Sequence, residues 1–212
     1  MIITYQGLQF IKIQQGDLTI AINPISKTSK HKSSRFGADI ALCSINHEDM
    51  NGADMVAHGD RNPFVIAGPG EYEVGGIFVK GFASPSHYDG EERINTIYSF
   101  IVDGINLCFL GAHDGANLST EVKEAIDGVD VLFVPIGGQG VLNAVEASKL
   151  AVKLEAKIVI PVHYGDVGDK DALKIFLKES DAEGVKGEDK LTLKRKDLDG
   201  KDGDVVVLEA QG

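Results

Sequence analysis

Apolar residues in the first half of the chain either alternate with polar ones or gather in short stretches. Both patterns are typical of β-strands when turn-forming residues separate them, as Gln15-Gly16-Asp17 and Asp103-Gly104 do here. We therefore expect many strands and hairpins in this half. The expected strands span residues 1–5, 8–14, 18–23, 38–43, 64–67, 72–74, 77–82, 95–102 and 105–110.

The second half alternates between helical and strand patterns. Ser119 or Thr120 is a suitable N-cap for one helix, and residues 143–155 form an amphipathic one. A strand-rich half followed by βα units predicts an α/β fold in which helices flank two sheets. The candidate core residues of helix 143–155 are Val145, Leu150, Val152 and Leu154. The other expected elements are strands 129–135 and 157–161, a helix at 169–180, and a terminal hairpin that pairs 190–195 with 204–208.

The composition predicts one compact soluble domain spanning residues 1–212. The chain is 43% hydrophobic and 25% charged, which is ordinary for a globular protein. It shows no basic signal segment and no stretch of about 18 apolar residues that would span a bilayer. Cys43 and Cys108 lie in apolar strand-like segments, where buried, reduced cysteine is the usual state. We expect a cytoplasmic protein without a disulfide scaffold.

The net charge of -11 argues against binding to nucleic acid or to an anionic membrane, because either would require a basic surface. The sequence gives no indication of the oligomeric state. One basic segment contrasts with the rest of the chain, and two interpretations of it stay open: a solvated surface loop, or an anion clamp over the mouth of a site. Its basic residues are Lys27, Lys30, His31, Lys32 and Arg35.

A polar loop, residues 44–50, follows the expected buried strand 38–43. Open sheets bind their ligands at the carboxyl ends of strands, so this loop is a candidate site. His47 and Asp49 lie two residues apart in it. Their side chains supply the nitrogen and oxygen donors that zinc and manganese accept.

The same loop resembles the His-x-His-x-Asp-His signature of the metallo-β-lactamase-fold hydrolases, with Ile45 and Met50 at the positions of the first and last histidines. The similarity is to the branch of ascorbate-6-phosphate lactonase-like proteins and covers roughly residues 1–180. It implies a four-layer αβ/βα sandwich. Further segments that resemble the family are Met1–Gly7, Leu18–Pro24, Gly68–Val74, Phe133–Gly138, Glu146-Ala147 and Val159–Tyr164.

The resemblance also implies a set of metal ligands. In that family two metal ions activate a bridging hydroxide that attacks a carbonyl or phosphorus centre. The family frame places His47 and His87 at one metal subsite, and Asp49 and His163 at the other. The bridging aspartate falls within segment 110–115. Strict register puts Ala112 there, a shift of two puts Asp114 there, and His113 lies between them; Asn23 stands where the family has an aspartate before proline.

Three functional hypotheses follow. A catalytic zinc keeps three protein ligands, whereas each subsite here retains two, so the resemblance implies an incomplete site with one weakly bound zinc or manganese, or none. The favoured hypothesis is a descendant of metal-dependent hydrolases with weak or no hydrolysis, whose cleft binds a small anionic ligand or a partner. The alternative is an active metal-dependent hydrolase of a small lactone, ester or phosphoester. A third, metal-free acid–base catalysis, lacks a matching nucleophile motif.

In the alternative hypothesis, Asp49 is the catalytic residue because it can orient the attacking water. The family frame further predicts that the three matched histidines converge on one cleft, and that Ile45 and Met50 fill the space of two missing imidazoles. His31 and His58 are interpreted as surface or hydrogen-bonded residues. The candidate metal ligands are His47, Asp49, His87, His163 and Asp114.

Overall fold

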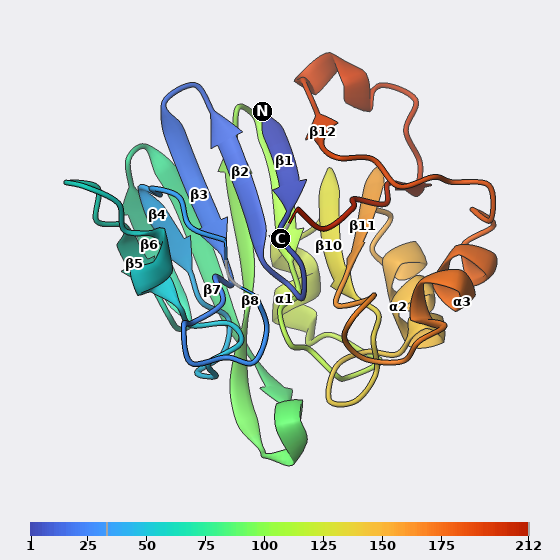
Figure 1. The fold of residues 1–212 in the computed structure, drawn as a ribbon. Helices are drawn as coiled ribbons and strands as arrows, with labels where there is room; N and C mark the ends of the chain where they lie inside the picture. The colour runs from blue at the N-terminus through green and yellow to red at the C-terminus, as the bar shows by residue number, and fades with distance from the viewer. Residues whose placement is uncertain (33, 212) are drawn as a thin grey trace.

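The computed structural model describes residues 1–32 and 34–211, and within them the strands form two sheets (Figure 1). The smaller sheet has six strands in the order β12-β1-β2-β3-β4-β5. Strands β1 to β3 are antiparallel neighbours, whereas β4 and β5 continue the sheet in parallel with β3. The strands are β1 (Ile2–Tyr5), β2 (Ile11–Gln15), β3 (Leu18–Ile22), β4 (Ile40–Leu42), β5 (Phe64–Ile66) and β12 (Leu191–Thr192).

The larger sheet has seven strands among the described residues, in the order β13-β11-β10-β9-β8-β7-β6. Strands β6 to β9 are antiparallel, and β10, β11 and β13 extend the sheet in parallel from β9. The strands are β6 (Gly70–Val74), β7 (Ile77–Ser86), β8 (Arg93–Val102), β9 (Ile105–Phe109), β10 (Val131–Pro135), β11 (Ile158–Val162) and β13 (Asp204–Val205).

Helices cover the outer face of the larger sheet (Figure 1). These are α1 (Thr120–Ala125), α2 (Ala144–Lys153) and α3 (Ala172–Glu179). The outer face of the smaller sheet carries the 3-10 turn η1 (Ala53–Val56) and loops, with Phe10, Ala41 and Val56 packed together. The predicted α/β sandwich is confirmed, with one outer layer reduced to η1 and loops. None of the helices in the described residues is long and apolar enough to cross a membrane.

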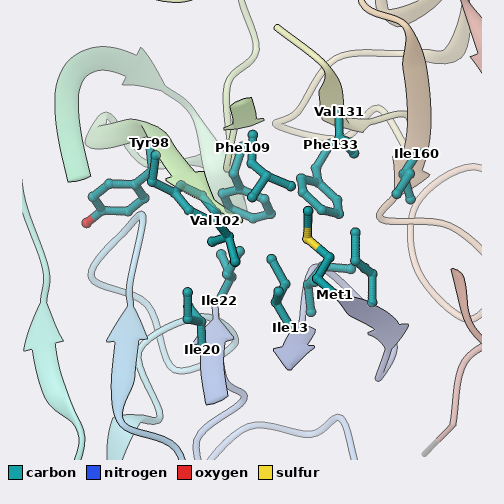
Figure 2. Packing of buried hydrophobic residues seen from close by; sticks show 14 of the residues in the cluster. Met1, Ile13, Ile20, Ile22, Tyr98, Val102, Phe109, Val131, Phe133 and Ile160 are labelled. Carbon is teal, nitrogen blue, oxygen red and sulfur yellow. The ribbon is translucent and has the colours of Figure 1, made fainter. Parts of the chain in front are cut away.

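The main core lies between the two sheets. Ile13, Ile20 and Ile22 of the smaller sheet face Phe109 and Phe133 of the larger one (Figure 2). These side chains are almost completely excluded from solvent. Apolar burial of this kind is the main favourable contribution to folding. Strands β10 and β11 are buried on both faces, as expected for parallel strands between two layers.

The helix ends and one helix face can be compared with the sequence predictions. Ser119 is the N-cap of α1, because its Oγ accepts a hydrogen bond from the backbone N–H of Val122 at 3.3 Å. Leu150 is buried as predicted, and Val145 and Leu154 are half-buried. The prediction for Val152 is wrong, since 73% of that residue is exposed. The packed face of α2 follows Ala144, Ala147, Leu150 and Ala151.

The predicted terminal hairpin is wrong. Strand β12 pairs antiparallel with β1, whereas β13 pairs parallel with β11 in the other sheet. Residues 193–203, which include the 3-10 turn η3 (Arg195–Leu198), connect them. Both sheets have an open edge here whose backbone groups need partners, so each short segment completes a different sheet instead of pairing with the other.

Both cysteines are buried and unpaired. Burial raises the pKa of the Cys43 and Cys108 thiols to about 12. They therefore stay protonated at neutral pH, and the prediction of buried, reduced cysteines is confirmed.

Asp130 is a buried carboxylate just before β10 that joins three parts of the fold. It accepts hydrogen bonds from Lys157 Nζ at 2.8 Å, from Arg195 Nη1 at 2.7 Å and from the backbone N–H of Asn106 at 2.9 Å. Burial by itself favours the protonated carboxyl. The hydrogen bonds and positive charges of its partners outweigh that effect, so the pKa of Asp130 lies below its usual value.

Replacing Asp130 with Asn is expected to lower the free energy of unfolding at neutral pH by about 1.5–3 kcal/mol, the range for hydrogen bonds to charged groups. Because the pKa is lower in the folded state, this contribution is complete above the unfolded value near 3.8 and is lost as the pH falls through the folded pKa. Urea unfolding at neutral and increasingly acidic pH measures the difference. The exposed Asp127, changed to Asn, is the matched control and should shift stability by less than about 0.5 kcal/mol.

Candidate functional site

A cleft of about 360 Å³ opens where several strands end. Its walls come from the loops after β3, β4 and β11 and from the 3-10 turn η2 (Tyr88–Gly90), which closes the β7–β8 hairpin. The cleft contains His47, Asp49 and His163, three of the residues expected to share a site. The carboxyl ends of β4 and β11 therefore meet as the sequence predicted.

Asp49 is the centre of the hydrogen-bond network in the cleft. Its Oδ1 accepts a hydrogen bond from Ser29 Oγ at 2.5 Å, and its Oδ2 accepts one from the Tyr88 hydroxyl at 2.9 Å. Burial opposes ionisation, but these two hydrogen bonds and the nearby His47 and His31 lower the pKa of Asp49. Asp49 is therefore an ionised carboxylate at neutral pH.

His47 lies beside Asp49 with both ring nitrogens near polar groups. Its Nδ1 accepts a hydrogen bond from the backbone N–H of Asp49 at 3.2 Å and lies 3.5 Å from Asp49 Oδ2. Its Nε2 is 3.5 Å from Asp89 Oδ2. A backbone N–H can only donate, so Nδ1 is the accepting nitrogen of this ring, and Nε2 faces Asp89.

Tyr88 fills the space between the two histidines of the cleft. Its ring meets His47 edge-on at a centroid distance of 5.0 Å and His163 edge-on at 5.7 Å, while its hydroxyl contacts Asp49. Burial and the Asp49 carboxylate raise the pKa of the phenol, so Tyr88 is a neutral donor. Tyr88 was not among the site residues predicted from the sequence. Its only signal in the sequence is its position next to His87.

His163 follows β11 in a left-handed backbone conformation, with φ of 61°. Burial lowers the pKa of its imidazole to about 4, so the ring is neutral at physiological pH. The adjacent backbone at Gly137 is very close: a Cβ there would lie 2.4 Å from the His163 carbonyl oxygen and 2.6 Å from its Cδ2. A glycine is therefore needed at 137 for the ring to occupy this position.

A buried polar chain lies behind His163. Gln9 Nε2 is 3.4 Å from His163 Nδ1, and Gln9 Oε1 accepts a hydrogen bond from Asn23 Nδ2 at 3.1 Å. Asn23 Oδ1 in turn accepts from the backbone N–H of Ser44 at 2.8 Å. The resemblance to the family drew attention to Asn23 but not to Gln9. The β1–β2 turn brings Gln9 between Asn23 and His163.

The two replaced histidine positions of the signature are apolar in the structure as well. Ile45 and Met50 are buried in a small cluster with Tyr88, Ala112 and Val141. Ile45 is 3% exposed and Met50 is fully excluded from solvent. Ala112 is the residue that strict register places at the bridging position, and it too packs in this cluster. Of this apolar cluster, Tyr88 is the member that lines the cleft.

His87 and Asp114 do not line the cleft, contrary to the expected convergence. His87 Nδ1 lies 2.6 Å from Asp114 Oδ2, which also accepts from the His87 backbone N–H at 2.9 Å. The His87 side chain is 64% exposed, and the hydrogen bond with Asp114 raises its pKa. The two residues therefore hold each other where β7 enters the turn of the β7–β8 hairpin, outside the lining of the cleft.

His113 was the third candidate near the bridging position, and it is buried elsewhere. Neither ring nitrogen has a partner of hydrogen-bonding geometry among the described residues, although the Gly115 backbone lies close enough to favour the charged ring slightly. Burial lowers the pKa of His113, so the ring is neutral at physiological pH. It does not join His163 or Asp49.

His31 was expected to be a surface or hydrogen-bonded residue, and the structure places it in the cleft. His31 is half-buried in the wall of the cleft, with its Nε2 4.0 Å from Asp49 Oδ2. The loop after β3 folds over the site, and the contact of Ser29 with Asp49 holds it there. His58 is exposed, as expected. The basic segment thus contributes to the cleft, which sequence periodicity could not show.

The charges around the cleft are mostly negative. Lys30 is the lining lysine among the described residues, beside His31. Four carboxylates also line the cleft, on Glu48, Asp49, Asp89 and Asp166. In the described residues, no three His, Cys, Asp or Glu side chains lie where they could together hold a metal ion.

A family model described as a β-lactamase superfamily domain matches residues 2–163. The match spans most of the chain, so this protein belongs to that superfamily. The membership predicted from the resemblance of the sequence is confirmed at the level of the superfamily.

Individual relatives match most of this chain. The chain is 26% identical to a UPF0173 metal-dependent hydrolase of Anoxybacillus flavithermus, across 77% of this chain and 86% of that protein. It is also similar to a solved structure from Thermotoga maritima assigned as a Zn-dependent hydrolase of the metallo-β-lactamase superfamily, with 28% identity, a TM-score of 0.77 and 98% of both chains covered. A metallo hydrolase of Ignicoccus hospitalis shares the fold at 19% identity, with a TM-score of 0.64 over 99% of this chain and 95% of that one.

Proposed function

We propose that this chain is a β-lactamase superfamily member whose cleft binds a small polar ligand, with a degenerate metal site and weak or no hydrolysis. The observation that carries the proposal is the apolar cluster of Ile45, Met50 and Ala112 with Tyr88. In the family frame the first three positions belong to metal ligands. Here they supply only hydrocarbon and thioether groups, and a buried thioether is a poor ligand for zinc or manganese.

The donors that remain do not fit a two-metal centre. His47, Asp49 and His163 lie in the cleft, but the Tyr88 ring separates the two histidines and its hydroxyl already binds Asp49. A zinc ion with catalytic function keeps three protein ligands and one open position. Asp49 is therefore better suited to hydrogen bonding with a ligand than to sharing metal ions.

The charged residues that line the cleft narrow the class of ligand that it can bind. A small anion was expected from the sequence, and among the described residues that line the cleft Lys30 is the one lysine or arginine that could bind it. Because four carboxylates face the same space, a neutral or zwitterionic molecule is electrostatically better accommodated than a free anion. An anionic group of such a ligand would lie next to Lys30.

The proposal predicts that protein purified without chelator contains substoichiometric zinc and manganese. Lactone, ester and phosphodiester probes should be hydrolysed at close to the uncatalysed rate, because weakly held metal does not fix the geometry needed to activate water. Elemental analysis and activity assays with and without added metal measure this. Robust metal-stimulated turnover that is lost in His163→Ala and Asp49→Ala, but kept in the exposed control His58→Ala, would overturn it.

The second candidate is an active metal-dependent hydrolase with a reduced site, of the ascorbate-6-phosphate lactonase-like kind, acting on a small lactone, ester or phosphoester. Two observations favour it. Relatives are named as metal-dependent hydrolases, and Asp49 Oδ2 lies within 4.0 Å of His31 Nε2 and 3.5 Å of His47 Nδ1. Loss of metal-stimulated activity in His31→Ala would select this candidate.

A further inference from the structure

We propose that the buried chain Ser44–Asn23–Gln9 fixes His163 as the Nε2-protonated tautomer, so that His163 donates a hydrogen bond to an oxygen acceptor of the ligand and does not act as a metal ligand. This rests on the proposed function, because it assigns the ligand chemistry of the same cleft. The proposal depends on which atom donates and which accepts in three successive hydrogen bonds. That order follows from the backbone N–H of Ser44, which can only donate.

The first hydrogen bond sets the orientation of Asn23. A backbone N–H can only donate, so the Asn23 atom 2.8 Å from the Ser44 nitrogen must be the carbonyl oxygen Oδ1. The amide nitrogen Nδ2 then faces the other way, 3.1 Å from Gln9 and 2.9 Å from Ser44 Oγ. A flipped Asn23 would place two donors against each other in a buried site.

The orientation of Asn23 determines that of Gln9. Since Asn23 Nδ2 is a donor, the Gln9 atom facing it is the acceptor Oε1, and the Gln9 amine Nε2 faces His163 Nδ1 at 3.4 Å. Nδ1 must therefore accept, and the neutral ring carries its proton on Nε2. Gln9 and Asn23 are fully excluded from solvent, Ser44 is 2% exposed and His163 is 3% exposed, so bulk water does not compete for these bonds.

The hydrogen bonds behind His163 run in the opposite direction to those behind a metal-binding histidine. A metal-binding histidine uses the lone pair of one ring nitrogen and donates its other N–H to a carboxylate or carbonyl. In His163, by contrast, Nδ1 accepts a hydrogen bond from Gln9 Nε2. No described residue makes a hydrogen bond to Nε2, which leaves its N–H for the cleft that His163 lines. A carbonyl or hydroxyl oxygen is the ligand group that such a donor binds.

Asn23 is the residue that determines which way the hydrogen bonds between Ser44 and His163 run. A carboxylate at this position would accept from both Ser44 and Gln9, so that the Gln9 amide would reverse. Gln9 Oε1 would then face His163 and accept its Nδ1–H, and the Nε2 lone pair would face the cleft. A one-atom change from amide to carboxylate thus converts the donor into a metal ligand without altering the shape of the site.

The test is nuclear magnetic resonance of the full chain with ¹⁵N-labelled histidine at neutral pH, in the presence of chelator. The chain has 6 histidines, and the signals of His163 are assigned by their loss in His163→Ala. The expected result is one tautomer, with a pyrrole-type shift for Nε2 and a pyridine-type shift for Nδ1. The opposite pattern in the wild-type protein would overturn the proposal whatever the variants show.

Two substitutions test the chain behind the ring. Gln9→Glu should reverse the tautomer, because a carboxylate accepts from both Asn23 and His163 Nδ1, and it should raise zinc affinity at least about tenfold by freeing the Nε2 lone pair. Gln9→Met should yield a mixture of tautomers without adding charge. Gln14→Glu on β2, outside the hydrogen-bonded series Ser44–Asn23–Gln9, is the control for added charge and should change neither. An unaltered His163 tautomer in both Gln9 variants would contradict the proposal.

Acetamide is the probe for the ligand role, since its carbonyl oxygen is a neutral acceptor. Titration into the wild-type protein should shift the Nε2-bound proton of His163, and this response should be absent in Gln9→Glu. No shift up to the solubility limit would overturn the donor role. These measurements use the metal-free chain, so they remain decisive if metal analysis overturns the proposed function, and the two failures are distinguishable.

Discussion

Replacing Ile45 and Met50 together with histidine is expected to raise the affinity for zinc by at least about tenfold, the lower end of what metal sites lose when supporting residues are removed. Both side chains pack against Tyr88, whose ring contacts His47 and His163. Two imidazoles at these positions would complete the signature around Asp49. Competition with a chromophoric chelator, or titration calorimetry, measures the change.

The matched control replaces Asn46 and Asn51 with histidine. These residues are exposed, lie next to the two test positions and add the same number of imidazoles outside the signature. The control should leave tight zinc binding unchanged. Equal zinc affinity in the two double variants, both folded by circular dichroism, would show that Ile45 and Met50 do not occupy ligand positions. If burial of two imidazoles prevents folding, the single variant Ile45→His supplies the comparison with Asn46→His.

Replacing Phe133 with alanine is expected to lower the free energy of unfolding by about 3–5 kcal/mol. Phe133 is fully buried between the sheets, with its ring centroid 6.2 Å from that of Phe109. Its removal leaves a cavity that rigid strands on both sides cannot fill by moving together. Urea unfolding followed by tyrosine fluorescence or circular dichroism gives the value.

Phe78 is the control for this substitution. It has the same side chain on β7 of the same sheet, but 61% of it is exposed. Changing Phe78 to alanine should alter the free energy of unfolding by no more than about 0.5 kcal/mol. A similar loss in both variants would mean that Phe133 does not lie in the inter-sheet core.

The local pattern was sufficient for most of the secondary structure. Alternation located β2, because one face of this strand packs in the core, and the capping preference of serine located the start of α1. It failed where partners lie far away in the sequence. Segments 190–195 and 204–208 look like a hairpin, yet each pairs with the edge of a different sheet. Likewise Val152 fits an apolar helix face by spacing, but no layer covers it.

The site shows the same division. His47 and Asp49 follow β4 of the smaller sheet, and His163 follows β11 of the larger one. Their meeting could be predicted from the family resemblance, because such loops bind ligands at the carboxyl ends of strands. The resemblance failed for His87, which directly follows β7 and was expected in the cleft, because its hydrogen bond with Asp114 holds it outside. His31 lies on the loop after β3, and no local pattern could place it beside Asp49.

The sequence by itself determined the superfamily, the α/β class and the apolar character of positions 45, 50 and 112, since these depend on residue type and order along the chain. Only the tertiary structure decided that Tyr88 fills the space between two histidines and that a buried amide chain directs His163. The reason is physical. A hydrogen bond has a direction fixed by which atoms meet, and residues 9, 23, 44 and 163 meet only once both sheets have formed.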